Sequence, residues 1–256
     1  SIPKFSYASS FGVSSIFPWQ RKGVAGFLKR LDLIGVREQR GKQIVKELTG
    51  KDAKVVCDPT FLLTTDEWIE ALMENEKERG LERNGEPYKI DTPYILAYVL
   101  GERKDVREEI KKLREQSGLK IVNLPHVDNY HAMDDNLGDI NLYDVDPFDF
   151  IRLIRDAEYV VTDSFHGSVF SIQMHKKFLT FYRKPSSEKG NTNSRIDSLF
   201  NILGLSERLY KGDVFNQIKK NIDYGYVDRQ VEELRIDSLA SVSYTHLRAH
   251  ETEADL

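Results

Sequence analysis

Hydrophobic and polar positions along the chain change period repeatedly, and the changes predict alternating strands and helices. Short apolar runs such as 33–36 and 159–161 are typical of buried strands. Helical spacing follows, for example at Phe27, Leu28 and Leu31, which we predict to form one apolar helix face. The predicted strands lie at 4–10, 33–36, 53–58, 94–100, 119–125, 158–163 and 177–182, and the third of them is ended by Pro59. Strands that alternate with helices are typical of parallel sheets covered on both faces, so we predict an α/β fold.

Several predicted helices carry recognisable start and stop signals. Thr64 and Glu67 have the spacing of a capping box, in which each side chain bonds the backbone of the other residue. Asp146 is followed by Pro147, which is the favoured order of an N-cap and a first helical residue. Gly50 ends a helical pattern where a left-handed residue is preferred. These signals fix three helix ends from local sequence alone.

Composition along the chain predicts two domains. Residues 75–92 are charged and contain Gly and Pro, as linkers do. We therefore expect an N-terminal domain over 1–90 and a C-terminal domain over 91–235. Because a strand begins almost at the first residue, we expect the N-terminal domain to be truncated. The segment 242–256 has no period tied to the preceding residues and resembles a translated sequencing adapter, so we expect a non-native tail.

Overall composition excludes some classes of protein. The chain has 256 residues and a net charge of −4, which disfavours a nucleic-acid binder, because such proteins hold phosphates with a surplus of Lys and Arg. The single cysteine, Cys57, lies in an apolar run and is expected to be a small buried residue. No apolar run has the length of a membrane span and no signal peptide is evident, so a cytoplasmic location is expected.

The stretch "YVVTDSFHGSVF" contains the strongest candidate site. Asp163, Ser164, His166 and Gly167 lie where a strand gives way to a helix. In open parallel sheets, ligands bind outside the carboxyl ends of the strands, and a helix N-terminus attracts anions. His166 can bind an anion or move a proton near neutral pH, and Gly167 would let the backbone approach a ligand. The alternative is structural: Asp163 or Ser164 caps the helix and His166 is a semi-buried histidine.

Two arginines also lie at predicted strand or helix ends where ligands can bind. Arg195 begins a helix after the polar loop 191–194, where a cation opposes the helix dipole unless an anion is bound. A salt bridge to Asp197 is the alternative. Arg37 directly follows a predicted strand and is expected to face the crevice side of the sheet.

Other motifs in the chain are weaker indications of a site. His126, Asp128 and His131 suggest a metal site, but their spacing matches no standard zinc motif, so we expect no metal. The chain has no GxxxxGK[ST] motif, no GxGxxG after a strand and no GxSxG motif. These absences disfavour P-loop enzymes, dinucleotide enzymes and ordinary serine hydrolases.

Taken together, "VVTDSFHGSVFSI", "KFLTFYR…NSRIDSLF" and "LIGVREQRGKQIVKELTGKDAKVVCDPTFLL" resemble the polysaccharide pyruvyl transferase family over residues 4–235. The resemblance implies two Rossmann-like domains with parallel sheets facing a cleft, as in GT-B glycosyltransferases. It implies that phosphoenolpyruvate is the donor and binds the C-terminal domain, while the N-terminal domain holds the sugar acceptor. The product would be a pyruvate ketal on a cell-surface polysaccharide. No cofactor is expected beyond this donor substrate.

The resemblance also implies residue roles. His166 is expected to act as the acid–base catalyst, with Asp163 orienting it or stabilising positive charge. The expected donor-binding residues are Arg37, Ser164, Phe165, Gly167, Ser194, Arg195 and His126. Ser164 departs from the family pattern, since many members have arginine there, and Arg195 is expected to supply the missing charge.

Two other functions remain open on sequence alone. One is a GT-B-like nucleotide-sugar glycosyltransferase, and the other is a non-catalytic domain that binds an anion or a glycan. The expected partners are phosphoenolpyruvate and a glycan or lipid-linked sugar acceptor, with peripheral membrane association only through that acceptor. Because of the expected truncation, the fragment itself is not required to be active.

Overall fold

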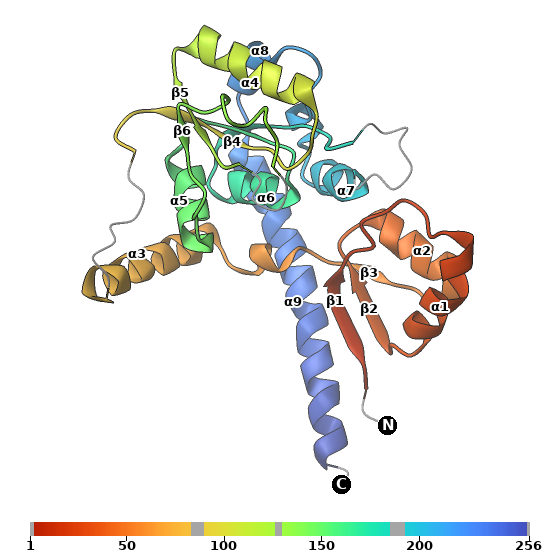
Figure 1. Ribbon diagram of the computed structural model, residues 1–256. Helices are drawn as coiled ribbons and strands as arrows, with labels where there is room; N and C mark the ends of the chain where they lie inside the picture. Colours follow the sequence, from red (N-terminus) through yellow and green to blue (C-terminus); the bar gives the residue numbers. More distant parts are fainter. Residues whose placement is uncertain (1–2, 83–89, 126–129, 185–192, 255–256) are drawn as a thin grey trace. The chain divides into compact units, whose positions relative to one another are not determined.

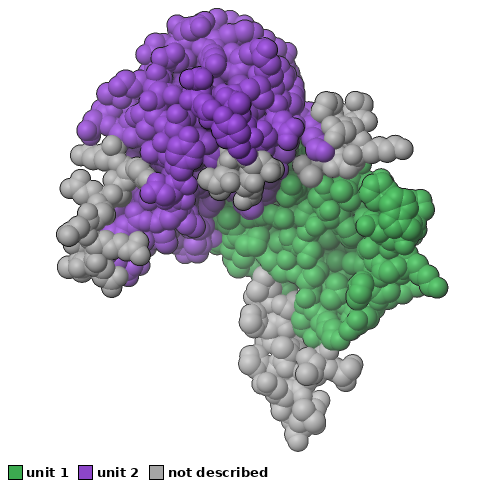
Figure 2. Space-filling model, in the orientation of Figure 1, with its two compact units in different colours: residues 1–62, 185–205, 224–256 green, residues 63–184, 206–223 purple. Residues whose placement is uncertain are grey.

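The computed structural model describes residues 3–82, 90–125, 130–184 and 193–254. The chain forms two compact units (Figure 2). Unit 1 comprises residues 1–62, 185–205 and 224–256, and unit 2 comprises residues 63–184 and 206–223. The sequence pattern instead placed a boundary near residue 90. The difference arises because the helix before that linker packs within unit 2, while two later segments join unit 1.

Unit 1 contains a small parallel sheet with helices from three parts of the chain (Figure 1). Its elements are β1 (Phe5–Ser9), α1 (Pro18–Lys29), β2 (Leu33–Val36), α2 (Gln39–Thr49), β3 (Lys54–Val55), the 3-10 helix η1 (Pro59–Leu62), α7 (Ser194–Ile202) and α9 (Tyr224–Ala254). The strands lie in the order β1-β2-β3, and both pairs are parallel. Ile34 and Val36 of β2 pack with Val45 of α2 in a buried cluster.

Two predictions for unit 1 were wrong in detail. Phe27 was expected on the apolar face of a helix, but its side chain is 69% exposed, while Leu28 and Leu31 do pack on the cluster. The strand expected from residue 53 up to Pro59 is limited to β3. The 3-10 helix η1 begins at Pro59, where the Asp58 carboxylate accepts from the Thr60 N–H.

The long helix α9 packs against the segment that follows β3 in unit 1. Its Arg235 donates from Nε to the carbonyl of Phe61 (2.7 Å), and its Ser238 hydroxyl accepts from the Cys57 N–H (2.9 Å). Cys57 is buried, as predicted. The helix continues to Ala254, through the segment 242–254 that showed no helical period in the sequence. Within the described ranges, no helix is both long and apolar enough to cross a membrane.

Unit 2 is a five-stranded parallel sheet covered on both faces (Figure 1). Its elements are α3 (Thr65–Glu82), β4 (Tyr94–Tyr98), α4 (Lys104–Ser117), β5 (Lys120–Asn123), β6 (Ile140–Asn141), α5 (Pro147–Asp156), β7 (Tyr159–Thr162), α6 (Phe165–Gln173), β8 (Lys177–Thr180), the 3-10 helix η2 (Ser206–Arg208) and α8 (Val214–Lys219). Helices α4 and α8 cover one face, and α5 and α6 lie on the other. The predicted parallel α/β arrangement is confirmed in both sheets.

The helix ends read from the sequence are confirmed. Thr64 N donates to the Glu67 carboxylate (2.7 Å) while Glu67 N donates to Thr64 Oγ1 (3.2 Å), which completes the capping box. The Asp146 carboxylate accepts from Asp149 N (2.8 Å) at the start of α5. Gly50 ends α2 with φ of +74°, in the left-handed region.

The C-terminal end of α3 is held within unit 2 by charged contacts. Arg79 pairs with Asp149 of α5 (3.0 Å), and Arg152 of α5 pairs with Glu76 (2.9 Å). The segment that looked like the end of an N-terminal domain therefore belongs to unit 2.

Candidate functional site at the carboxyl edge of the unit 2 sheet

The strand order of unit 2 defines where a ligand is expected. The order β6-β5-β4-β7-β8 means that the chain proceeds outward from β4 in one direction and then returns to continue from β7 in the other. Ligands of open α/β sheets bind at such a reversal, outside the carboxyl ends of the two strands. Tyr98 ends β4 opposite Thr162, which ends β7. The turn after Tyr98 and the stretch 163–167 therefore lie at the same edge.

Asp163 joins the two strand ends. Its Oδ1 accepts from the Leu100 N–H and its Oδ2 from the Gly101 N–H, both at 2.8 Å. The residue is almost fully buried, and Arg183 Nε lies 3.8 Å from Oδ1. These contacts give Asp163 a positioning role, since its carboxylate fixes the turn that borders the site.

Ser164 is the N-cap of α6. Its hydroxyl accepts from Gly167 N (3.3 Å), and its own N–H donates to Thr162 Oγ1 (3.0 Å). The capping interpretation of Ser164 is therefore confirmed. The Ser164 side chain is buried and its hydroxyl caps the helix, so the residue brings no charge to the site.

Gly167 is required by packing against Thr162. A Cβ at residue 167 would lie 2.5 Å from Thr162 Oγ1. Thr162 cannot easily withdraw, because this hydroxyl donates to the Tyr98 carbonyl (2.7 Å) and accepts from Ser164 N. The sequence suggested that Gly167 allows a ligand to approach, but the close neighbour in the structure is the preceding strand.

This contact predicts the effect of Gly167→Ala. Overpacking a tight site costs about 1–3 kcal/mol, so the variant is expected to lower the free energy of unfolding of unit 2 by that amount. Denaturant unfolding followed by circular dichroism measures it. Gly23→Ala in α1 is the matched control, because nothing lies within 4 Å of the added methyl group there. Equal stability of the two variants would contradict the packing argument.

His166 is the exposed member of the stretch. It lies on the first turn of α6, between the buried residues Phe165 and Gly167, and its ring packs edge-on to Phe165 with centroids 5.5 Å apart. The positive end of a helix dipole lies at this turn. Its exposure at the carboxyl edge of a strand differs from the semi-buried histidine of the structural alternative.

Arg183 is a site residue that the sequence reasoning missed. It follows β8 at the same edge, and its Nε is buried without a hydrogen-bond partner among the described residues. Gly101 makes room for it, since a Cβ at residue 101 would lie 2.7 Å from Arg183 Cγ. An arginine directly after the last predicted strand was the available signal, and the same signal did identify Arg37.

The other predicted donor-binding residues that the structure describes belong to unit 1. Arg37 forms an ion pair with Asp58, which links the ends of β2 and β3, and Asp58 also accepts from the Thr60 hydroxyl (2.8 Å). Ser194 and Arg195 begin α7, as the sequence predicted. Within unit 1, α7 packs on α2, where Gln39 N donates to Ser198 Oγ (3.3 Å).

His126, Asp128 and His131 suggested a metal site although no metal was expected, and His126 is also a predicted donor ligand. His126 and Asp128 lie outside the described residues, whereas His131 is described. Among the residues that the structure does describe, no group of three His, Cys, Asp or Glu side chains is arranged to hold a metal ion.

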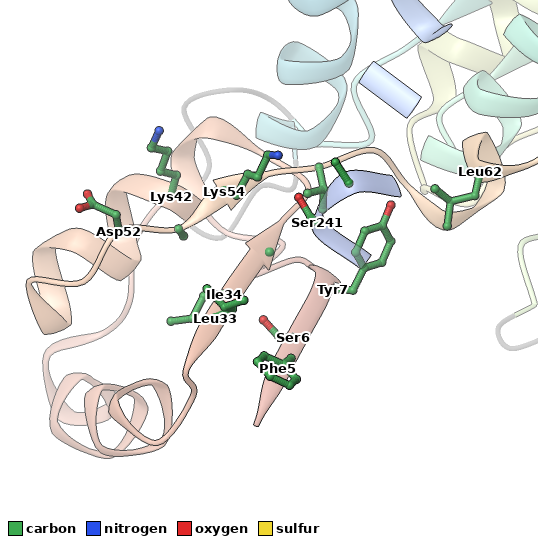
Figure 3. A pocket seen from close by; sticks show the side chains of 14 residues that line it. Phe5, Ser6, Tyr7, Leu33, Ile34, Lys42, Asp52, Lys54, Leu62 and Ser241 are labelled. Carbon is green, nitrogen blue, oxygen red and sulfur yellow. The ribbon is translucent and has the colours of Figure 1, made fainter. Parts of the chain in front are cut away.

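A separate cavity of about 850 Å³ lies in unit 1 (Figure 3). Strand residues Phe5, Tyr7 and Leu33 line it, together with Ser241 of α9, and Lys42 and Lys54 also border it. Burial, followed by a hydrogen bond to Cys57, raises the pKa of Tyr7 well above its usual value. None of the predicted site residues lines this cavity.

Solved structures that are similar to this chain bear on its fold. A variant of the wall teichoic acid polymerase TagF matches with a TM-score of 0.50 and 11% identity, covering 94% of this chain and 63% of that one. Two UDP-GlcNAc 2-epimerases score lower. The one from Neisseria meningitidis has a TM-score of 0.47 and 11% identity, covering 84% of this chain and 62% of its own. The one from Methanocaldococcus jannaschii has a TM-score of 0.46 and 15% identity, covering 80% and 61%.

The likeness to TagF supports a GT-B-like α/β fold and says nothing of activity. The chain spans less than two thirds of the length of each of these proteins. No curated protein matches it in sequence. The family model for polysaccharide pyruvyl transferase matches residues 2–185. The chain therefore belongs to the polysaccharide pyruvyl transferase family, as its motifs predicted.

Proposed function

We propose that this chain transfers the pyruvyl group of phosphoenolpyruvate onto sugar hydroxyls of a polysaccharide, forming a pyruvate ketal and releasing phosphate. Membership of the family supports a polysaccharide-modifying transferase. The observation that carries the finer proposal is the exposed His166 at the start of α6, on the edge where the strand order reverses. We also propose that each unit is one Rossmann-like domain of the GT-B type.

The residue types at this edge suit the donor. Phosphoenolpyruvate is a small anion with several charges, and both a helix N-terminus and a guanidinium bind phosphate and carboxylate groups. Ser164 removes the positive charge that many family members have at that position. Arg183 supplies a guanidinium within the same unit, held over Gly101 and beside Asp163. We therefore assign to Arg183 the positive charge that Arg195 was expected to supply.

The proposed reaction needs a proton donor and acceptor at one place. A proton is added to the methylene carbon of the donor while a first sugar hydroxyl forms a bond to the central carbon and loses its proton. A second hydroxyl then attacks the same carbon, loses its proton, and the bond to phosphate breaks. His166 is the proposed group that moves the proton, because histidine exchanges protons near neutral pH. Arg183 stabilises the charge on the departing phosphate. The scheme requires no metal.

Phosphate release tests the proposal directly. The protein is incubated with phosphoenolpyruvate and, in turn, methyl glycosides of galactose, glucose, mannose and N-acetylmannosamine, and phosphate is measured. Release that depends on one of the sugars is expected. No release, together with no binding of phosphoenolpyruvate by calorimetry, would refute the proposal. Thermal stabilisation by a UDP-sugar instead would favour the glycosyltransferase alternative, and binding without turnover would favour the non-catalytic one.

The role of Arg183 makes a separate prediction. Arg183→Met keeps the aliphatic stem over Gly101 and removes the charge, so the dissociation constant for phosphoenolpyruvate is expected to rise about 10-fold or more. Arg114→Met is the control, because Arg114 pairs with Asp139 on an exposed part of the same unit. Calorimetric titration measures both variants. Unchanged affinity in Arg183→Met would remove Arg183 from the donor site.

The remaining assignments keep the status of proposals. Arg37, Arg195 and Phe165 are proposed donor ligands on the family resemblance, whereas Ser194, which the resemblance also gave, is assigned a different ligand. Alanine variants of Arg37 and Arg195, titrated with phosphoenolpyruvate in the same way, test the two charged ones.

A further inference from the structure

Glu38 is a fully buried acid that the proposed reaction does not use. It directly follows Arg37 and is the N-cap of α2, with an extended backbone at φ of −130°. The residue therefore lies at the carboxyl end of β2, on the edge of unit 1's sheet where ligands of parallel sheets bind.

One oxygen of Glu38 is firmly held. Its Oε1 accepts from the Ser10 hydroxyl (3.1 Å) and from the Phe11 N–H (3.0 Å), both in the loop after β1. Gly41 leaves the necessary space, since a Cβ there would lie 3.2 Å from Oε1. The carboxyl group is thus fixed in position between the ends of β1 and β2.

The second oxygen of the Glu38 carboxylate makes no such hydrogen bonds to the described residues. Oε2 is buried and has no hydrogen-bond partner anywhere in the described part of the chain. A buried polar atom without a partner costs about 1–3 kcal/mol, so such an atom calls for an explanation. A carboxylate that is fixed through one oxygen, while the other oxygen has no hydrogen bond, is typical of a group that binds a ligand.

A second buried polar atom without a described hydrogen-bond partner lies on a neighbouring helix. Ser194 Oγ of α7 is buried and has no hydrogen-bond partner among the described residues. Ser194 precedes Ser198 by four residues, so the two lie on one face of α7. Ser198 bonds the N–H of Gln39, the residue after Glu38. Both unpartnered atoms therefore belong to elements that meet at the start of α2.

The chemistry of the two atoms selects the ligand. An ionised carboxylate only accepts hydrogen bonds, and a serine hydroxyl both accepts and donates. A pair of sugar hydroxyls satisfies both, because each hydroxyl can donate as well as accept. We infer that Glu38 Oε2 and Ser194 Oγ form a binding site for sugar hydroxyls at the edge of unit 1's sheet. That the sugar is the acceptor of pyruvyl transfer rests on the proposed function.

Binding of simple glycosides tests the site. Saturation-transfer NMR is recorded on the full chain with methyl glycosides of galactose, glucose, mannose and N-acetylmannosamine. The wild type is expected to bind at least one. Glu38→Gln keeps the shape but turns the Oε2 position into a donor, and it is expected to weaken binding 10-fold or more. Glu47→Gln is the matched control, since Glu47 is an exposed acid on the same helix, paired with Arg40.

A second variant distinguishes a loss of glycoside binding from a loss of folding. Ser194→Ala removes a hydroxyl that has no described partner, so its melting temperature is expected to match the wild type while glycoside binding falls. Equal binding by wild type, Glu38→Gln and Ser194→Ala would mean that a buried water satisfies Oε2, and would overturn the inference. So would a wild type that binds none of the four sugars.

Phosphoenolpyruvate titration separates this inference from the proposed function. Both variants are expected to bind phosphoenolpyruvate as the wild type does. Loss of phosphoenolpyruvate binding in Ser194→Ala, with glycoside binding intact, would return Ser194 to the donor site and overturn its role here. Absence of phosphoenolpyruvate binding in the wild type would refute the proposed function and leave the sugar site standing.

Discussion

The variant His166→Ala is expected to lose about 100- to 10,000-fold of the rate of phosphate release from phosphoenolpyruvate, the usual contribution of a positioned acid–base group. The loss should appear in kcat, because other groups at the edge still bind the donor. Its melting temperature should match the wild type, since the imidazole is exposed and the packing of α6 rests on its buried neighbours. Steady-state phosphate release and thermal unfolding measure the two quantities.

His175→Ala is the control for this variant. His175 is also exposed and lies two residues beyond the C-terminal end of α6, away from the strand edge at which His166 lies. It should retain nearly full activity. An unchanged rate in His166→Ala would exclude the imidazole from the chemistry, and a similar loss in both variants would point to a general effect on α6.

The second large effect is expected from Asp134→Ala. Arg107 of α4 is almost fully buried and pairs with Asp134 through two contacts, Nε to Oδ1 (2.6 Å) and Nη2 to Oδ2 (3.1 Å). Removing one partner of a buried pair leaves an uncompensated charge and costs about 3–5 kcal/mol. Denaturant unfolding should show that decrease in the free energy of unfolding of unit 2.

The same substitution is expected to disturb the candidate site. Arg107 also donates from Nη1 to the Gly101 carbonyl (2.7 Å), and the N–H of Gly101 donates to Asp163. Asp134→Ala should therefore weaken phosphoenolpyruvate binding although Asp134 is not a proposed ligand. Asp52→Ala is the control, because Asp52 forms an exposed pair with Lys46 and should leave the unfolding midpoint nearly unchanged. Equal midpoints in the two variants would contradict the prediction.

Features determined by neighbouring residues were predictable from the sequence. The capping box of Thr64 and Glu67, the N-cap Asp146 and the stop at Gly50 depend on a few adjacent positions, and all three are confirmed. The start of α7 and the strand at 33–36 were also correct, since their patterns are local. The placement of 163–167 between a strand and a helix followed from the same kind of signal.

Features determined by distant residues were not predictable. In the sequence, Arg107 is one of many charged residues in its helix, and nothing nearby indicates that it is buried. Its partner Asp134 is brought beside it only by the fold. Gly167 reads as a site for a ligand, whereas its constraint comes from Thr162. Phe27 fits an apolar stripe, but nothing in its own segment tells whether another element covers it. The partners of Asp163 depend on the register of β4 against β7, which no single segment encodes.

The discontinuous make-up of unit 1 has a consequence for the order of folding during synthesis. Most of unit 2 is one stretch, 63–184, completed by 206–223, so its sheet can form as soon as that stretch has left the ribosome. Unit 1 begins the chain, yet the contacts of Arg235 and Ser238 with the segment after β3 need α9, which is translated later. Strands β1–β3 are therefore translated well before the helix that completes their unit, and most of unit 2 lies between them in the chain.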